Sequence, residues 1–154
     1  MDALRSDIEI RFVGGALPPG FELLRHAADG EAYNMLAVLA KEWAEGTNRF
    51  EKPGEALVAA YEGEHLAGLG AMTHDPNVEG ALRMRRFYVS PRHRRSGIGR
   101  ALAHALLDRA AVQGKMITLN APQVEAARFW EALGFVRDNK DGHTHVRMEP
   151  YSHA

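Results

Sequence analysis

The segment from Arg94 to Gly99 reads Arg-Arg-Ser-Gly-Ile-Gly and has the residue types best suited to binding chemistry. It lies between a strand-like run that ends at Val89 and an alanine- and leucine-rich stretch typical of a helix. Gly97 and Gly99 lack a Cβ, so the backbone can turn tightly and approach a ligand closely. The helix that follows begins with free N–H groups that carry partial positive charge. The segment therefore predicts a site for a phosphate-bearing ligand.

Positive charge is concentrated around this segment. The chain has a formal net charge of −1, but residues 83–100 contain no Asp or Glu, so the remainder sums to about −8. An anion site and a solvated basic face are both open interpretations. We expect no nucleic-acid partner, because single-strand binding prefers interleaved aromatic residues that this cluster lacks. The seven arginines of the cluster are Arg83, Arg85, Arg86, Arg92, Arg94, Arg95 and Arg100.

Length and composition set the class of protein. A chain of 154 residues, 45% hydrophobic and 25% charged, is expected to fold as one globular domain over residues 1–154. No apolar run approaches the roughly 18 residues that span a membrane. The N-terminus also lacks the basic-then-apolar layout of a signal peptide. Cysteine is absent, which excludes disulfides and cysteine-based metal or thiol chemistry. We expect a cytoplasmic protein without membrane contact.

Hydrophobic patterning predicts a mixed α/β fold. Alternation from Ile8 to Val13 is typical of a half-buried strand, and apolar residues at helical spacing predict three helices, the first with Asp29 as its N-cap. Gly68 and Gly70 interrupt one strand and indicate close backbone contact. The last hairpin turn is expected over 138–142. We expect strands over 8–13, 56–61, 65–72, 81–89, 116–119, 135–137 and 143–148, and helices over 31–43, 98–113 and 122–133.

The strand expected over 81–89 changes phase. Leu82 and Met84 keep the two-residue period of a strand, but the next apolar positions are Phe87 and Val89, so the period slips by one residue. A β-bulge between Met84 and Phe87 would explain the slip and leave backbone N–H groups able to meet a ligand. Chance in a short window is the alternative explanation.

Three other interpretations of the glycine segment are excluded by its spacing. A dinucleotide-binding turn needs a third glycine where this chain has Leu102. A phosphate-binding P-loop needs Gly-Lys-Ser/Thr, which is missing. A nucleophile elbow needs a glycine two residues before Ser96, where Arg94 stands.

What remains is a strand, then Pro91, then Arg-x-x-Gly-x-Gly at a helix start. This resembles the acyl-coenzyme-A-binding motif of the GCN5-related N-acetyltransferase (GNAT) superfamily, whose pyrophosphate loop has Arg or Gln, two residues, Gly, one residue and Gly or Ala. The preceding Phe-Tyr-Val-Ser-Pro at 87–91 resembles the family's strand before the loop. The segment Ala-Ala-Arg-Phe-Trp-Glu-Ala-Leu-Gly-Phe at 126–135 is similar to the family's Ala-x-x-Phe-Tyr-x-x-x-Gly-Phe. Together these cover residues 82–136 in the family's order and spacing.

The resemblance implies the fold and the activity. The fold would be the acyl-CoA N-acyltransferase (GNAT) fold, of α/β (α+β) class, with a mixed, mostly antiparallel six- to seven-stranded sheet and helices on both faces. The sheet would splay between the strand ending at Val89 and the one ending near Leu119. The activity would be acetyl transfer from acetyl-CoA to an amine, with no metal.

The same resemblance implies a cofactor site. The pantetheine arm would run beside the backbone of Phe87 and Val89, and the pyrophosphate would meet N–H groups from Arg95 to Arg100. Asn120 or Gln123 would contact the cofactor's amide groups. The residues expected to bind acetyl-CoA are Phe87, Tyr88, Val89, Arg94, Arg95, Ser96, Gly97, Ile98, Gly99, Arg100, Asn120, Gln123 and Trp130.

By the family's habit, the amine attacks the thioester directly, and the backbone N–H of Val89 is the natural oxyanion donor. The general acid is unassigned, because Trp130 stands where relatives often have Tyr and an indole is not an acid in water. We expect Trp130 to pack against the cofactor arm or the core, and Phe129, Leu133 and Phe135 to belong to the core.

The general base is unassigned as well. Relatives often have a Glu on the strand near the bulge, where this chain has Arg83 and Arg85. Glu79 and His143 are the leading candidates for the base. The others are His74 and Asp75 before the strand and His145 in the last hairpin.

Acceptor pockets in this family are built from segments that correspond to residues 20–50 and 74–80. Acids there could attract a cationic amine but are equally explained as solvated surface; they are Glu42, Glu45, Asp75 and Glu79. The acceptor would be a small-molecule or protein amine, and the family's habit makes a homodimer a further expectation. The alternative to catalysis is a non-catalytic acetyl-CoA-binding sensor of the same fold.

Overall fold

A seven-stranded sheet forms the centre of the molecule, in the order β1-β2-β3-β4-β5-β7-β6. The computed structural model describes residue 5 and residues 7–148. All neighbouring strands pair antiparallel except β4 and β5, which are parallel. This confirms the expected mostly antiparallel sheet. The strands are β1 (Ile8–Phe12), β2 (Ala56–Glu62), β3 (His65–His74), β4 (Leu82–Val89), β5 (Ile117–Leu119), β6 (Val136–Lys140) and β7 (His143–Arg147).

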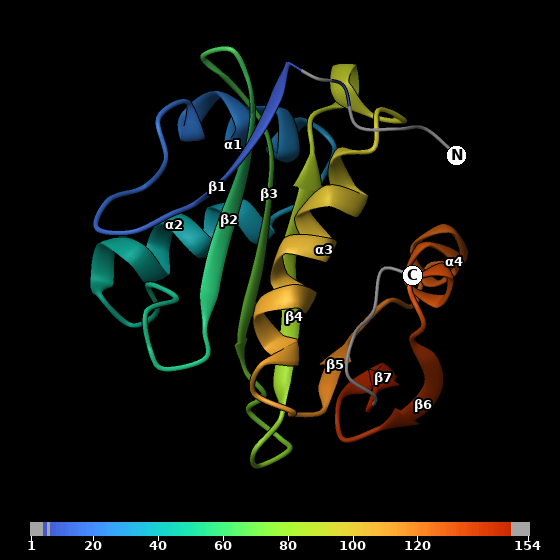
Figure 1. Cartoon of the computed structure of the whole chain (residues 1–154). Helices are drawn as coiled ribbons and strands as arrows, with labels where there is room; N and C mark the ends of the chain where they lie inside the picture. The colour runs from blue at the N-terminus through green and yellow to red at the C-terminus, as the bar shows by residue number, and fades with distance from the viewer. Residues whose placement is uncertain (1–4, 6, 149–154) are drawn as a thin grey trace.

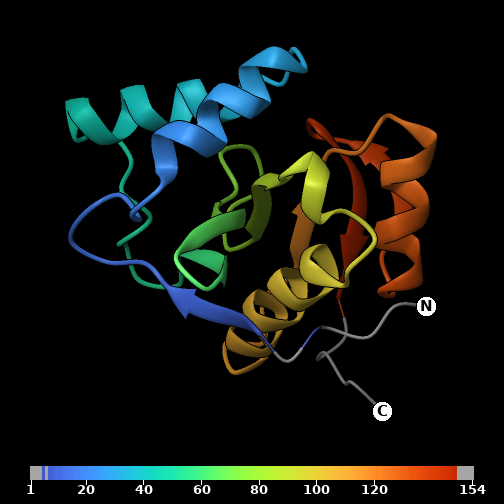
Figure 2. The same cartoon turned by 90° about the horizontal axis from the view of Figure 1, so that it is seen from above.

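Helices cover both faces of the sheet, as Figures 1 and 2 show. One apolar cluster joins the sheet to α1 (Phe21–Gly30) and α2 (Met35–Glu45). The other joins the opposite face to α3 (Ile98–Ala111) and α4 (Val124–Ala132). A short 3-10 turn, η1 (Pro91–His93), links β4 to α3. No helix in the described part of the chain has the length and apolar character needed to cross a membrane.

The expectation of a single first helix over 31–43 was wrong. The chain forms two helices, and Asp29, the expected N-cap, lies near the end of α1. Ala32 between them has a φ of 60°, which lies outside the region of a right-handed helix. The missed helix α1 buries Phe21, Leu24 and Ala28, at the helical spacing that a core-facing stripe requires.

The last hairpin turn is tighter than the expected 138–142. Strand β6 runs to Lys140, and β7 begins at His143. Asp141 and Gly142 form the connection, with φ values of 53° and 83°. Asp-Gly is the sequence that favours such two-residue hairpin turns, because both central residues need positive φ.

A β-bulge interrupts β4 where the hydrophobic phase slips, which confirms that prediction. Leu69 on β3 faces Tyr88, whereas Ala71 faces Arg85, so β4 holds one extra residue in this stretch. Arg86, within the bulge, has a φ of 60°. The close approach expected at Gly70 is also present, since a Cβ there would lie 2.8 Å from the ring of Phe87.

Candidate functional site

The predicted anion-binding segment forms a compact turn between η1 and α3. Arg95 and Gly97 have left-handed backbone conformations, with φ values of 61° and 84°. The hydroxyl of Ser96 donates a hydrogen bond to the carbonyl of His93, which holds the turn closed. The first α3 bond that returns to the turn runs from the N–H of Ala101 to the carbonyl of Gly97. The N–H groups of Ile98, Gly99 and Arg100, which precede Ala101, lie at the positive end of the helix and suit an anion.

This turn borders a cleft of about 340 Å³. Most residues around it were expected from the motif, but His93 and Phe129 were not. Phe129 was expected in the core, and the structure corrects this: its ring is half-buried and forms a wall of the cleft opposite Gly99. The described residues that line the cleft are Val89, His93, Arg94, Arg95, Gly97, Ile98, Gly99, Arg100 and Phe129.

The second feature of the site is an open edge of β4. Only the first two residues of β4 pair with β5, through Leu82 with Ile117 and Arg83 with Thr118. The two strands then separate, which confirms the expected splay of the sheet (Figure 1). The N–H of Ser90 donates to the carbonyl of Ala67 on β3 at 2.8 Å. Because such bonds alternate along an antiparallel pair, the N–H of Val89 points away from β3, toward the open edge.

A family model described as the acetyltransferase (GNAT) domain matches residues 26–151. This chain belongs to the GNAT acetyltransferase family. No curated protein shows a significant sequence match.

Solved structures of acetyltransferases share the GNAT fold of this chain. A candidate acetyltransferase from Exiguobacterium sp. 255-15 has a TM-score of 0.82 at 22% identity, over 92% of this chain and 93% of its own. The acetyltransferase from Streptococcus agalactiae 2603 has a TM-score of 0.70 at 17% identity, over 94% of this chain and 99% of its own. A mutant of the toxin AtaT, bound to the C-terminus of the antitoxin AtaR and acetyl-CoA, has a TM-score of 0.68 at 10% identity, with 92% of each chain covered.

In this GNAT domain, Arg94 joins the anion-binding turn to the segment between α1 and α2. Its guanidinium pairs with the carboxylate of Glu31, at 3.0 Å from Nη1 to Oε2, and its Nε donates to the carbonyl of Val89 at 3.0 Å. The hydroxyl of Tyr88 also donates to Glu31, at 2.5 Å. The hydrogen bond from Arg94, followed by that from Tyr88, lowers the pKa of Glu31. The sequence carried no local signal for Glu31, because it lies 63 residues before Arg94.

Tyr88 keeps its proton at neutral pH in this arrangement. Burial, together with the bond to Glu31, raises the pKa of Tyr88 to about 12. Tyr33 stacks on it with ring centroids 5.3 Å apart, and burial raises the pKa of Tyr33 to about 12 as well. These rings therefore form a neutral wall beside the end of β4.

Trp130 packs in the core, which is one of the two placements expected from the sequence. Its ring meets Phe87, Phe129 and Phe135 edge to face, with centroids 4.8, 5.0 and 5.4 Å apart, and the residue is only 7% exposed. Phe129 thus connects the core aromatic group to the cleft. Asn120 and Gln123, the other expected cofactor ligands on this side, are exposed between β5 and α4.

Asp75, a candidate base, is held in a buried polar network. Its side chain is 0% exposed and accepts bonds from the hydroxyl of Thr118 at 2.6 Å and from the backbone N–H of Asn77 at 2.7 Å. The guanidinium of Arg83 lies 3.5 Å away. Both carboxylate oxygens are therefore engaged in structural contacts, and the network ties the loop before β4 to β5.

The remaining candidate bases also lie outside the described lining of the cleft. Glu79 is exposed in the loop before β4, at the opposite end of that strand from Val89. Nε2 of His74 lies 2.6 Å from the carbonyl oxygen of Pro53. His143 and His145 are buried in β7, where Nε2 of His145 lies 2.8 Å from Glu131 and Nε2 of His143 lies 3.4 Å from Asp138. Among the described residues, no group of His, Asp and Glu is arranged to hold a metal ion.

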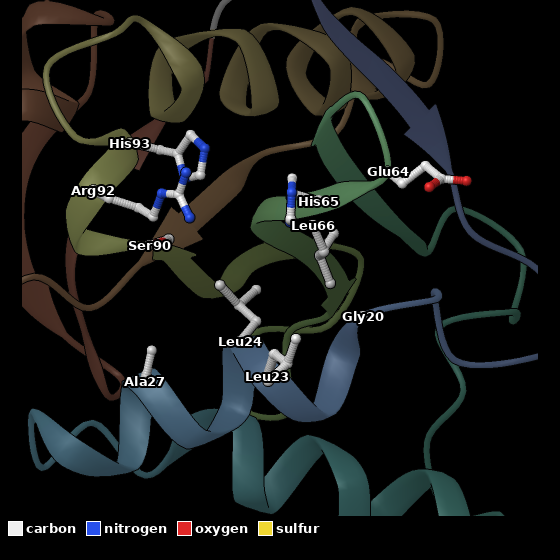
Figure 3. Close-up of a pocket in the computed structure, with 10 residues that line it drawn as sticks. All are labelled: Gly20, Leu23, Leu24, Ala27, Glu64, His65, Leu66, Ser90, Arg92 and His93. Carbon is white, nitrogen blue, oxygen red and sulfur yellow. The ribbon is translucent and has the colours of Figure 1, made fainter.

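A second hollow of about 210 Å³ lies on the other side of η1 (Figure 3). Leu23 and Leu24 of α1 form an apolar side, and Arg92 and His93 of η1 and His65 of β3 face them. His93 borders both hollows, so η1 is the partition between them.

Proposed function

We propose that this protein is an N-acetyltransferase that moves an acetyl group from acetyl-CoA to a primary amine, which attacks the thioester directly. One observation carries the proposal: the anion-binding turn at the start of α3 and the open edge of β4 meet at one cleft. A cosubstrate with a phosphate-rich end and an amide-containing arm needs both features side by side. Membership of the GNAT family supports the same activity.

The residues around the cleft fit coenzyme A. The N–H groups of Ile98, Gly99 and Arg100 would hold the pyrophosphate, with further positive charge from Arg95. The free edge of β4 beside Phe87 would pair with amides of the pantetheine arm.

Acetyl-CoA, when bound, supplies the thioester carbonyl. The N–H of Val89, directed to the open edge, would donate to the oxygen as negative charge develops on it. The amine nitrogen bonds to the acetyl carbon, the carbon–sulfur bond breaks, and the proton lost by nitrogen balances the one gained by the thiolate. We propose that water carries these protons, because none of the bases expected from the sequence is among the described residues that line the cleft, and His93, which does line it, is held against Glu62 at 3.0 Å. A thiolate also leaves readily, with a thiol pKa of about 8.5.

The test combines cofactor binding with turnover. Isothermal titration with coenzyme A measures binding, and thiol release measures transfer across amines, amino acids, polyamines and aminoglycosides. We expect micromolar to millimolar binding and acceptor-dependent thiol release. Binding without thiol release for any acceptor would overturn the transfer reaction and favour a sensor.

A matched pair of glycine variants tests the location of the site. Gly97 and Gly114 have positive φ and stand at opposite ends of α3, so alanine strains the backbone at each by about 1–2 kcal/mol. Gly97→Ala is expected to weaken coenzyme A binding at least tenfold, whereas Gly114→Ala should leave it unchanged. Equal effects on binding would contradict the assignment of the turn.

A further inference from the structure

β4 contains three arginines, Arg83, Arg85 and Arg86, and two of them have carboxylate partners. Arg83 pairs with Asp75 at 3.5 Å, and Arg86 pairs with Glu42 of α2 at 3.0 Å. Arg86 also donates to the sulfur of Met35 at 3.4 Å, so its side chain lies against α2.

The third arginine, Arg85, is on the same face. It stands opposite Ala71 on β3, and residues paired across strands share a face of the sheet. Ala71 belongs to the apolar cluster under α1 and α2, as does Tyr88 on the far side of the bulge. Arg85 therefore lies on the α2 side of β4, just before the bulge that leads to the open edge.

Arg85 is a half-buried cation without a carboxylate partner. Among the described residues, no Asp or Glu oxygen lies within 4.0 Å of its guanidinium, in contrast to Arg83 and Arg86. Burial, and then the charges of Arg86 and Arg83, lower the pKa of Arg85. The more distant charges of Glu42 and Asp75 oppose this lowering of the pKa, but neither carboxylate is within hydrogen-bonding reach of Arg85. A half-buried guanidinium without a direct partner is costly to the fold and is a candidate for ligand binding.

Two of the four acids expected in the acceptor region, Glu42 and Asp75, are already engaged, whereas Glu45 and Glu79 are exposed. Glu42 is bound to Arg86, and Asp75 is bound to Arg83, Thr118 and backbone N–H groups. Neither carboxylate is free to attract a cationic amine. The charge left over on this part of β4 is the positive charge of Arg85.

We propose that the acceptor is an amine that also carries a carboxylate, and that Arg85 binds this carboxylate while the amine reaches the thioester. A guanidinium matches a carboxylate through two parallel hydrogen bonds, which gives orientation as well as affinity. The inference rests on the proposed acetyl transfer and narrows its substrate class to amino acids and related amino-carboxylates. Atoms balance as in the parent reaction: the amide bond forms, the thioester bond breaks, and the carboxylate is unchanged.

The test compares amino acids with their C-terminal amides in thiol-release assays, because each pair differs only in the carboxylate. We expect the best amino acid to exceed its amide by at least about 30-fold in kcat/KM. Arg85→Gln should remove most of that preference while leaving the amide's kcat/KM and the affinity for coenzyme A unchanged. Arg85→Lys should retain part of the preference, since it keeps the charge without the paired geometry.

Arg109→Gln is the matched control. It also removes one positive charge, but from α3, where the guanidinium lies 4.2 Å from the ring of Phe12. It should change neither acid nor amide turnover. Equal turnover of acids and amides by the wild type, or an equal loss of both in Arg85→Gln, would overturn the carboxylate assignment.

A binding measurement separates this inference from the proposed function. Titration of the same amino acids into the protein saturated with coenzyme A does not depend on turnover. Binding that Arg85→Gln abolishes, without thiol release, would support the carboxylate site and contradict acetyl transfer. Thiol release with amides and polyamines, but no amino-acid preference, would support transfer and contradict the carboxylate site.

Discussion

Asp75→Ala is expected to lower the free energy of unfolding by about 3–5 kcal/mol, because it leaves a buried cation without its partner. The side chain of Asp75 is 0% exposed and that of Arg83 is 11% exposed, so water cannot replace the lost contact fully. The substitution also removes the acceptor for the Thr118 hydroxyl and for the backbone N–H groups of Asn77 and Val78. For a chain of this size the loss corresponds to a fall in Tm of roughly 6–20 °C.

The effect should depend on pH in a defined direction. Burial by itself would raise the pKa of the Asp75 carboxyl, but the hydrogen bonds from Thr118 and Asn77, with the charge of Arg83, hold that pKa below its usual value. The carboxylate's contribution to stability is therefore fully present above the pKa of an unfolded aspartate, about 3.9. It is lost as the pH falls through that value and then through the lower pKa of the folded protein.

Urea unfolding followed by circular dichroism, at pH 7 and at steps down to pH 3, measures both effects. Asp75→Ala combined with Arg83→Met should recover most of the lost stability, because the double variant leaves no unpaired charge. Asp29→Ala is the control: its exposed pair with Arg25 at 3.6 Å should contribute less than about 1 kcal/mol. A loss below about 1 kcal/mol in Asp75→Ala would refute the reasoning, as would a loss of stability toward pH 3 that is the same in Asp75→Ala as in the wild type.

Asp75→Asn should keep kcat within about tenfold, because both carboxylate oxygens of Asp75 serve the fold. A larger loss of kcat in folded protein would make Asp75 the base.

Three further variants test the packing around the cleft. Gly70→Ala should lower the free energy of unfolding by about 1–3 kcal/mol, because its Cβ would lie 2.8 Å from the Phe87 ring. Gly14→Ala is the control and should be nearly neutral, because nothing lies within 4 Å of a Cβ at that position. Thermal melts that rank the two variants in the opposite order would contradict the packing at the bulge. Trp130→Phe should retain much of the turnover, and a loss of about three orders of magnitude in kcat with normal folding would make the indole catalytic. Phe129→Ala should weaken coenzyme A binding about tenfold, or about 1.4 kcal/mol, by opening one wall of the cleft; unchanged affinity in titration would remove Phe129 from the site.

The chemistry of the donor site was readable from short stretches of sequence. The glycine turn, the phase slip before Phe87 and the segment around Phe129 each depend on residues within a few positions of one another. Local backbone preferences and strand periodicity determine such features, so the turn and the bulge lie where they were expected. No helix was expected at α1, which begins directly after the Pro-Pro-Gly sequence at 18–20.

The sequence by itself determined the fold class, the anion-binding turn and the position of the bulge, because these follow from spacing along the chain. Only the tertiary structure decided which charges meet. Glu31 reaches Arg94 across 63 positions, and Glu42 reaches Arg86 across 44, through the packing of α1 and α2 on the sheet. The same packing decided which arginines of β4 have a carboxylate within reach. Arg83, Arg85 and Arg86 look alike in the sequence, but among the described residues Asp75 pairs with Arg83 and Glu42 with Arg86, which leaves Arg85, just before the bulge, without a carboxylate partner.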